Sequence, residues 1–199
     1  MEKQFENTIK QGKQAEIIAI AGSAGSFSLL IELIKVFVPE VSPAIVMLIH
    51  RSSGYKSEWL KILSKYAVCE VLEIADKQKI EAGKIYIPPQ KYHTLAEPTF
   101  CWSLDSGEPV WFSRPSIDVL FESIADIFGE KALGILLSGA NQDGAIGIKK
   151  IAEKGGLTII QNPEDAEYKI MTKTALTLCD KHYVLHQDDI LTFCRNLIN

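Results

Sequence analysis

The sequence lacks the long apolar run of a membrane-spanning helix, and it lacks an excess of basic residues. No stretch approaches the roughly 20 apolar residues that cross a bilayer. The 21 lysines and arginines are outnumbered by 25 aspartates and glutamates, which gives a formal net charge of −4. A general nucleic-acid binder usually carries a basic stripe. We therefore expect no membrane insertion and no nucleic-acid partner.

Cysteines are few and are not spaced as bridges or metal ligands. The four cysteines are scattered along the 199 residues. Disulfide scaffolds are usually short secreted chains, and zinc sites bring cysteines and histidines in close pairs. Residues 1–15 are polar and mixed in charge, so no signal peptide is visible. These features predict reduced thiols, no metal, no cofactor and a cytoplasmic protein.

The chain does have short apolar runs that alternate with amphipathic stretches. Residues 1–15 form a polar tail or a loosely attached helix. Strands are predicted over 16–22, 44–49, 84–87, 133–138, 157–161 and 182–185. Helices are predicted over 26–37, 54–65, 116–128, 144–154, 171–178 and 188–197. Short strands in the middle, including 68–74 and 99–104, suggest a hairpin or an antiparallel edge. We expect one doubly wound, Rossmann-like, three-layer α/β domain over 16–199, mostly parallel, with a small antiparallel hairpin.

Three polar residues follow apolar runs at the predicted ends of strands. Ser23 follows the first run, His50 closes the second, and Asp143 lies just beyond the run at 133–138. Because the carboxyl ends of parallel strands share one edge of a sheet, these residues would converge there. A nucleophile, a base and an orienting acid are what acyl transfer requires.

The turn around the serine is built from small residues, at 21–26 (AGSAGS). The amides of Ala24 and Gly25 are candidate donors to an oxyanion at the start of the following helix. Two other readings stay open. The turn could cradle a phosphate, although it lacks the full glycine spacing of such loops, and Ser23 could simply cap the helix.

The histidine and the aspartate also have alternatives. Composition alone does not separate His50 from His93, which likewise follows a strand. A histidine near a hydroxyl can act as a general base, but most histidines at strand ends are structural. Asp143 could orient a histidine, or it could belong to a loop with a helix cap.

Three segments of the sequence resemble the catalytic domain of the chemotaxis-receptor methylesterase (CheB) family. Residues 20–25 (IAGSAG) resemble its nucleophile turn and point to Ser23. Residues 48–50 (LIH) resemble its second strand and point to His50 rather than His93. Residues 135–145 (ILLSGANQDGA) resemble its acid segment and point to Asp143.

Further segments resemble the family in the same order along the chain. They are 83–89 (GKIYIPP), 113–121 (SRPSIDVLF) and 156–161 (GLTIIQ), and the resemblance spans roughly 16–184. The chain departs from the family where Ser26 replaces a glycine, Ser113 replaces a histidine, and 170–172 (IMT) replaces Gly-Met-Pro. Ala140 stands where the family often has methionine, which changes the pocket beside the triad.

The resemblance implies hydrolysis of glutamyl γ-methyl esters on the cytoplasmic helices of methyl-accepting chemotaxis receptors, and for some members deamidation of receptor glutamines. Arg114 either steers acidic neighbours of the methylated glutamate or anchors its loop to the helix that follows. The family usually carries a receiver domain, for which this sequence has no room. Control is therefore expected from a separate response regulator in trans, or is absent.

Two other functions stay open. The chain could be a catalytically silent module that docks on receptors, because the segment 139–142 is altered. It could also hydrolyse another small ester, because a fold does not fix a substrate.

Overall fold

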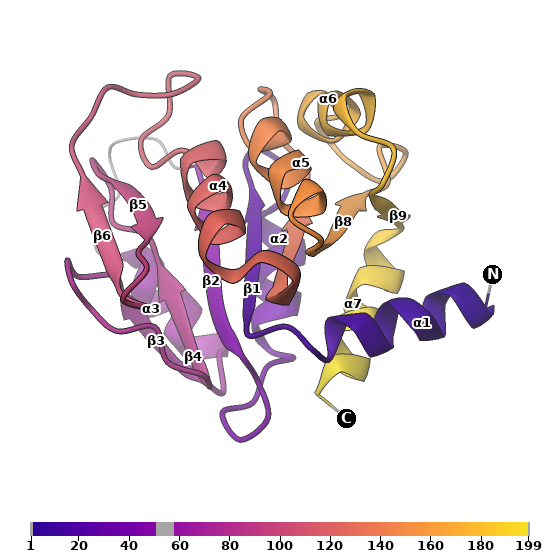
Figure 1. Cartoon of the computed structure of the whole chain (residues 1–199), viewed down its shortest axis with the longest axis horizontal. Helices are drawn as coiled ribbons and strands as arrows, with labels where there is room; N and C mark the ends of the chain where they lie inside the picture. The colour runs from indigo at the N-terminus through magenta and orange to yellow at the C-terminus, as the bar shows by residue number, and fades with distance from the viewer. Residues whose placement is uncertain (1, 51–57, 199) are drawn as a thin grey trace.

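A parallel sheet forms the centre of the molecule in the computed structural model, which describes residues 2–50 and 58–198 (Figure 1). Its strand order is β3-β4-β2-β1-β7-β8-β9, and the paired neighbours are all parallel. The strands are β1 (Ile17–Gly22), β2 (Ala44–Ile49), β3 (Glu70–Glu73), β4 (Lys84–Ile87), β7 (Ala132–Leu136), β8 (Leu157–Gln161) and β9 (Tyr183–Leu185). A separate antiparallel hairpin joins β5 (His93–Ala96) to β6 (Trp102–Asp105).

Helices cover both faces of the sheet. One face packs against α4 (Ile117–Phe128), α5 (Ala145–Glu153), α6 (Ile170–Leu178) and the β5–β6 hairpin. The other face packs against α1 (Glu2–Gly12), α2 (Phe27–Ile34), α3 (Glu58–Tyr66) and α7 (Gln187–Leu197). A single 3₁₀ turn, Gly129–Lys131, precedes β7. The predicted three-layer α/β fold is therefore confirmed.

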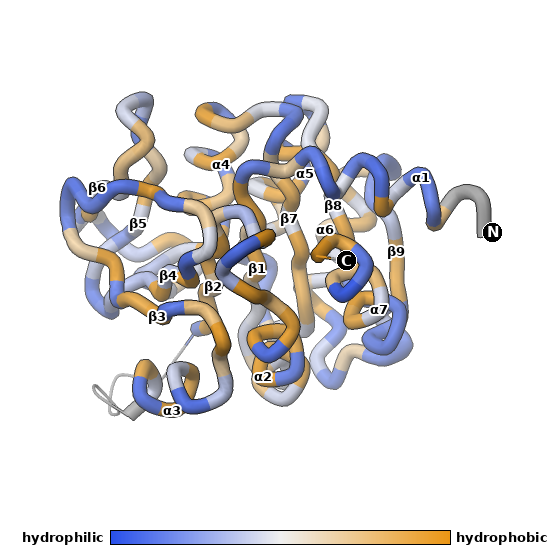
Figure 2. The backbone as a smooth tube through the Cα atoms, turned by 90° about the horizontal axis from the view of Figure 1, so that it is seen from below, coloured by the Kyte–Doolittle hydropathy of each residue, from blue (hydrophilic) through white to orange (hydrophobic). Residues whose placement is uncertain are grey.

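The central strands are continuous apolar runs because both of their faces are covered. Every residue of β1 and of β7 is buried. Figure 2 shows the same pattern, with hydrophobic stretches along the central strands and hydrophilic stretches mainly in the outer loops and helices. Such strands are rigid supports for whatever follows them at the carboxyl edge.

The middle of the chain differs from the expected arrangement. The antiparallel hairpin exists, but it is formed by β5 and β6, whereas the strands over 70–73 and 84–87 are parallel members of the main sheet. The short strand β5 was missed because its four residues have no clear alternation. The expected helix over 54–65 is found from residue 58 onward, and its earlier part lies outside the described residues.

The N-terminal segment contains a helix, α1, that packs on α7. The rings of Phe5 and Phe193 lie edge to face with centroids 6.4 Å apart. A side-chain carbon added at Gly12 would come within 2.6 Å of Leu197, so the end of α1 is pressed against α7. The boundary between a tail and the catalytic domain at residue 16 stays a prediction.

Within residues 2–50 and 58–198, no helix has the length and apolar character needed to cross a bilayer.

Candidate active site

Three neighbouring strands bring the candidate residues to one edge of the sheet. Gly22 of β1 pairs with Ile49 of β2, so Ser23 and His50 leave the sheet at the same level. The His50 N–H donates to the Gly22 carbonyl at 3.2 Å. On the other side of β1, the Ser23 N–H donates to the Ser138 carbonyl at 2.8 Å. The backbone of Ser23 is therefore held between the segments that carry His50 and Asp143.

The turn after Ser23 is fixed by a residue that must be glycine. Gly25 has φ +79°, and a Cβ there would lie 2.7 Å from the Glu167 Cβ. Both the hydroxyl and the N–H of Ser26 donate to the Ser23 carbonyl, at 2.6 and 3.2 Å. Ser26, not Ser23, is the N-cap of α2. The N–H groups of Ala24 and Gly25 make no hydrogen bond to another described residue, so they can serve as the predicted oxyanion donors.

Asp143 is fully buried at the N-terminus of α4. Its Oδ1 accepts hydrogen bonds from the Ser116 hydroxyl at 2.8 Å and from the Asp118 N–H at 2.9 Å. Its Oδ2 accepts one from the Ile117 N–H at 2.8 Å. Helix N-termini and charge-assisted hydrogen bonds both stabilise a carboxylate. Asp143 therefore caps a helix distant in sequence while its charge is held in a fixed orientation.

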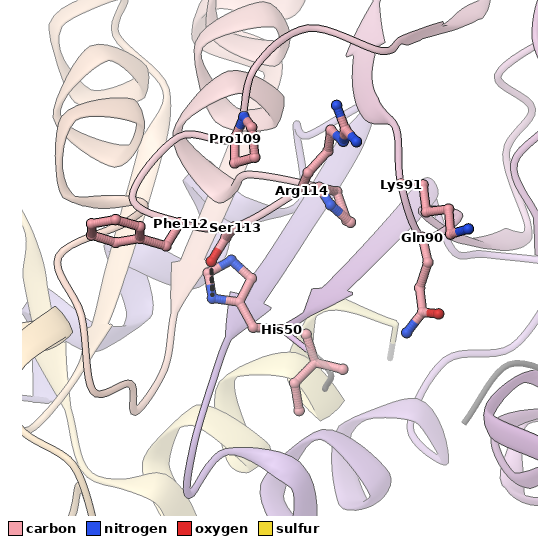
Figure 3. A pocket seen from close by; sticks show the side chains of 9 residues that line it. His50, Gln90, Lys91, Pro109, Phe112, Ser113 and Arg114 are labelled. Atoms are coloured by element: carbon pink, nitrogen blue, oxygen red, sulfur yellow. Dashed lines mark hydrogen bonds between the residues drawn. The ribbon is translucent and has the colours of Figure 1, made fainter. Parts of the chain in front are cut away.

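His50 lies against this carboxylate. Its Nε2 is 2.9 Å from the Asp143 Oδ2, an ion-pair distance, although the N–H axis is not aligned on an acceptor. A carboxylate beside Nε2 favours a proton on that nitrogen and leaves the lone pair on Nδ1. The Nδ1 atom lies 3.4 Å from the Ser113 hydroxyl (Figure 3). No hydrogen bond joins the described side chains of Ser23 and His50.

A loop over residues 106–115, called the site loop below, covers this edge. Arg114 holds the two ends of this loop together, because its Nη1 donates to the carbonyls of Ser106 and Gly107, each at 2.7 Å. Among the described residues, the hydrogen-bond partners of Arg114 are thus two carbonyls of its own loop, and not groups of the helix that follows. His93 adds a further contact to the loop, since its ring contacts the Glu108 carbonyl at 2.9 Å through Nε2.

His93 also links the site loop to α4. It is buried, and its Nδ1 accepts a hydrogen bond from the Ser116 N–H at 3.2 Å. Ser116 is in turn the N-cap of α4 and a donor to Asp143. Of the two histidines that composition could not separate, His50 contacts the acid directly and His93 supports it through Ser116.

Asp118 is a second buried carboxylate that the sequence reasoning did not single out. It accepts hydrogen bonds from the Trp111 Nε1 at 3.0 Å and from the Gly147 N–H at 2.8 Å. Burial, with a smaller contribution from the nearby charge of Asp143, raises the pKa of Asp118 from 3.8 to about 6. A signal was present in the sequence, because Asp118 lies in the first turn of the helix between the apolar residues Ile117 and Val119.

The altered segment before the acid ties two loops together. Asn141 accepts the Asp143 N–H at 3.2 Å and donates to the Trp111 carbonyl at 3.4 Å. Ala140 is exposed and Gly139 is buried. The segment thus connects Asp143 to the site loop through Asn141, rather than through the position of Ala140.

A cavity of about 400 Å³ opens beside His50 (Figure 3). Its lining includes the cationic residues Lys91 and Arg114, the hydroxyl-bearing Ser113, and the exposed ring of Phe112. Among the described residues, no carboxylate lines it. Ser23 is not among the lining residues, so the cavity adjoins the base rather than the serine, and its positive charge suits an acidic group.

In the part of the chain that the structure describes, no group of three or more histidines, cysteines, aspartates or glutamates is placed to hold a metal ion.

A serine, a histidine and a buried carboxylate at the carboxyl ends of three adjacent parallel strands are typical of the hydrolases that use an activated serine. The family model of the CheB methylesterase matches residues 18–193. The chain belongs to the CheB methylesterase family.

Relatives and a solved structure agree with this membership. A relative from Leptospira interrogans, named as a candidate protein-glutamate methylesterase/protein-glutamine glutaminase, is 38% identical over 88% of this chain and 91% of its own. The protein-glutamate methylesterase/protein-glutamine glutaminase of Hydrogenovibrio crunogenus is 32% identical over 85% of this chain but only 46% of its own. This chain therefore spans about half the length of some relatives and nearly the whole of others.

The crystal structure of the Thermotoga maritima CheB methylesterase catalytic domain has a TM-score of 0.84 at 24% identity. The matched region covers 92% of this chain and 99% of that domain. This likeness shows that the two chains share a fold. The family and the names of its members together support a methylesterase hydrolase.

Proposed function

We propose that this chain hydrolyses γ-methyl esters of glutamate on the cytoplasmic helices of chemotaxis receptors, with Ser23 as nucleophile, His50 as base and Asp143 as orienting acid. The observation that carries the proposal is the contact of His50 with a buried carboxylate at the strand end next to Ser23. The protein would act in the cytoplasm, as part of signal transduction. Deamidation of receptor glutamines uses the same attack on a side-chain carbonyl and is included in the proposal.

The first half of the reaction forms an acyl-enzyme. Ser23 Oγ attacks the ester carbonyl while His50 Nδ1 takes the serine proton. Asp143 keeps the other ring proton on Nε2 and stabilises the imidazolium. The N–H groups of Ala24 and Gly25 donate to the oxyanion. The C–O bond to methoxide then breaks, and the proton on Nδ1 leaves with methanol.

The second half releases the glutamate. Water enters beside Nδ1, loses a proton to it and attacks the acyl carbonyl. The tetrahedral intermediate collapses, the bond to Ser23 breaks, and the proton returns to Ser23 Oγ. Apo structures often lack the nucleophile–base hydrogen bond, which tightens when substrate is bound. The absence of a bond between Ser23 and His50 is therefore compatible with this sequence of steps.

The surroundings of the cavity suit a helical protein substrate. Lys91 and Arg114 make the cavity locally positive, although the net charge of the protein is −4. This local charge favours a substrate whose modified glutamate is flanked by acidic residues. Phe112 is fully exposed at the rim, with φ +61°. Exposed aromatic rings at a cavity rim are common anchors for protein partners.

Methanol release from a purified, methylated cytoplasmic receptor fragment tests the proposal. The wild-type protein should release methanol, and Ser23→Ala and His50→Ala should reduce release to the residual level of a disabled triad. Ser106→Ala, an exposed serine in the site loop, is the matched control and should keep full activity. Release by Ser23→Ala at most of the wild-type rate would reject the assignment.

A further inference from the structure

The serine hydroxyl that contacts the base in this structure is Ser113. Its Oγ lies 3.4 Å from the His50 Nδ1 and 3.5 Å from the Trp111 carbonyl (Figure 3). A hydroxyl has one proton to donate and two lone pairs that accept. It can therefore donate to Nδ1 when the ring is neutral, and turn its proton to Trp111 when Nδ1 itself carries one.

Hydrogen bonds within the site loop hold the backbone that carries this hydroxyl. The Ser113 N–H donates to the Val110 carbonyl at 2.8 Å, and the Val110 N–H donates back to the Ser113 carbonyl at 3.1 Å. Arg114 then joins the end of the loop to its beginning, through the carbonyls of Ser106 and Gly107. The position of Ser113 relative to the base is thus set by several contacts.

The same contacts connect Ser113 to the acid. Asn141, which accepts the Asp143 N–H, also donates to the Trp111 carbonyl. The ring of His50 therefore lies between two groups of one connected network, Asp143 at Nε2 and Ser113 at Nδ1. A contact at each nitrogen restricts rotation of the ring, although the Nε2–H axis is not aligned on the carboxylate.

We propose that Ser113 is a positioning residue, which holds the His50 ring in the orientation that directs Nδ1 to the reacting atoms and provides a hydrogen-bond partner for Nδ1 in both protonation states. This inference rests on the proposed function. In the free enzyme Ser113 donates to Nδ1. During acyl transfer the Ser23 hydroxyl takes the place of Ser113 at the Nδ1 lone pair. The Ser113 hydroxyl then rotates and donates its hydrogen bond to the Trp111 carbonyl.

Ser113→Ala and Ser113→Thr test the inference in the folded, full-length chain. One net hydrogen bond corresponds to about a threefold to tenfold change in rate, so Ser113→Ala should lower kcat for methanol release by that factor without changing KM. Ser113→Thr keeps the hydroxyl and should restore most of kcat. Ser106→Ala should match the wild type, and all variants should keep the wild-type Tm.

A fluorophosphonate makes the test independent of the receptor. The serine oxygen attacks phosphorus, the P–O bond forms, fluoride leaves and the serine proton passes to His50. Peptide mass spectrometry should find the label on Ser23 in the wild type and in Ser113→Ala. Labelling of Ser113→Ala should be slower by the same factor as its loss in kcat, and Ser23→Ala should take no label.

The outcomes separate this inference from the proposed function. Wild-type kcat and labelling in Ser113→Ala would overturn the positioning role and leave Ser23 as nucleophile. An equal loss in Ser113→Ala and Ser113→Thr, or a fall in Tm that accounts for it, would overturn it in favour of a merely structural side chain. A label on Ser113 in the wild type would overturn both the inference and the assignment of Ser23.

Discussion

Replacement of Asp143 by asparagine separates the two roles that the structure gives to this carboxylate. The amide has the same shape but only one acceptor oxygen, whereas the carboxylate accepts from Ser116, Ile117 and Asp118 and faces His50. If the NH₂ group takes the place of Oδ2, it meets the Ile117 N–H and donates to the His50 Nε2. The ring proton then moves to Nδ1, which can no longer accept the proton of Ser23.

The expected losses follow from these contacts. A wrong tautomer of the base costs on the order of a thousandfold or more in kcat. One buried N–H left unpaired, together with the charge lost at a helix N-terminus, lowers the free energy of unfolding by about 2–4 kcal/mol. The same substitution therefore lowers both kcat and the free energy of unfolding, which are measured in separate assays.

Methanol release measures the first loss, and urea unfolding measures the second. Asp126→Asn is the control, since the ion pairs of this half-exposed carboxylate on α4 with described residues are those to Lys150 and Lys154. Surface ion pairs contribute at most about 1 kcal/mol, so the control should be nearly silent in both assays. Asp143→Asn with a tenth or more of wild-type kcat, or with wild-type stability, would refute the reasoning.

Three further predictions use other parts of the site. Burial raises the pKa of Asp118 from 3.8 to about 6, so its contribution to stability is full below pH 3.8 and is lost as the pH rises through 6. Between pH 4 and pH 7.5 the wild type should therefore lose about 2 kcal/mol more free energy of unfolding than Asp118→Asn, measured by urea unfolding at both pH values. Gly25→Ala should lower the urea midpoint more than Gly155→Ala, because both have similar positive φ but a Cβ at Gly155 meets nothing closer than 3.6 Å; equal shifts would count against crowding at the serine turn. Phe112→Ala should raise KM for the receptor fragment about tenfold without changing kcat for a small activated ester, and an unchanged KM would show that the ring does not touch the substrate.

The arrangement of the three strand ends could be predicted because β1, β2 and β7 are short apolar runs that end abruptly in polar residues. A continuous apolar run of that length predicts a strand covered on both faces. If such strands are parallel, their carboxyl ends lie at the same edge of the sheet. Ser23, His50 and Asp143 are accordingly found where the sequence placed them. Their catalytic roles stay predictions.

The site loop could not be predicted in the same way. Trp111 and Phe112 both have positive φ, at 47° and 61°, which local propensity disfavours for aromatic residues. Side-chain contacts that local propensity does not encode accompany this conformation, namely the hydrogen bond of Trp111 to Asp118 and those of Arg114 to two carbonyls. The linkage of His93 to Ser116 is of the same kind, because no pattern in the sequence records which buried donor a histidine meets.

The departure at Ser113 shows how sequence and structure complement each other. Comparison with the family pattern marks this position as different, but it does not say what the serine does. The structure supplies the missing part, a hydroxyl beside the Nδ1 of the base.

The central claim is that Ser23 removes methyl groups from receptor glutamates. Incubation of a methylated receptor fragment with the protein, followed by peptide mass spectrometry, tests it most directly. The account predicts that the wild type converts γ-methyl glutamates to glutamates, each losing the mass of one methylene, and that Ser23→Ala leaves every site methylated. Sites that stay methylated with the folded wild-type protein, or that are demethylated equally by Ser23→Ala, would contradict it.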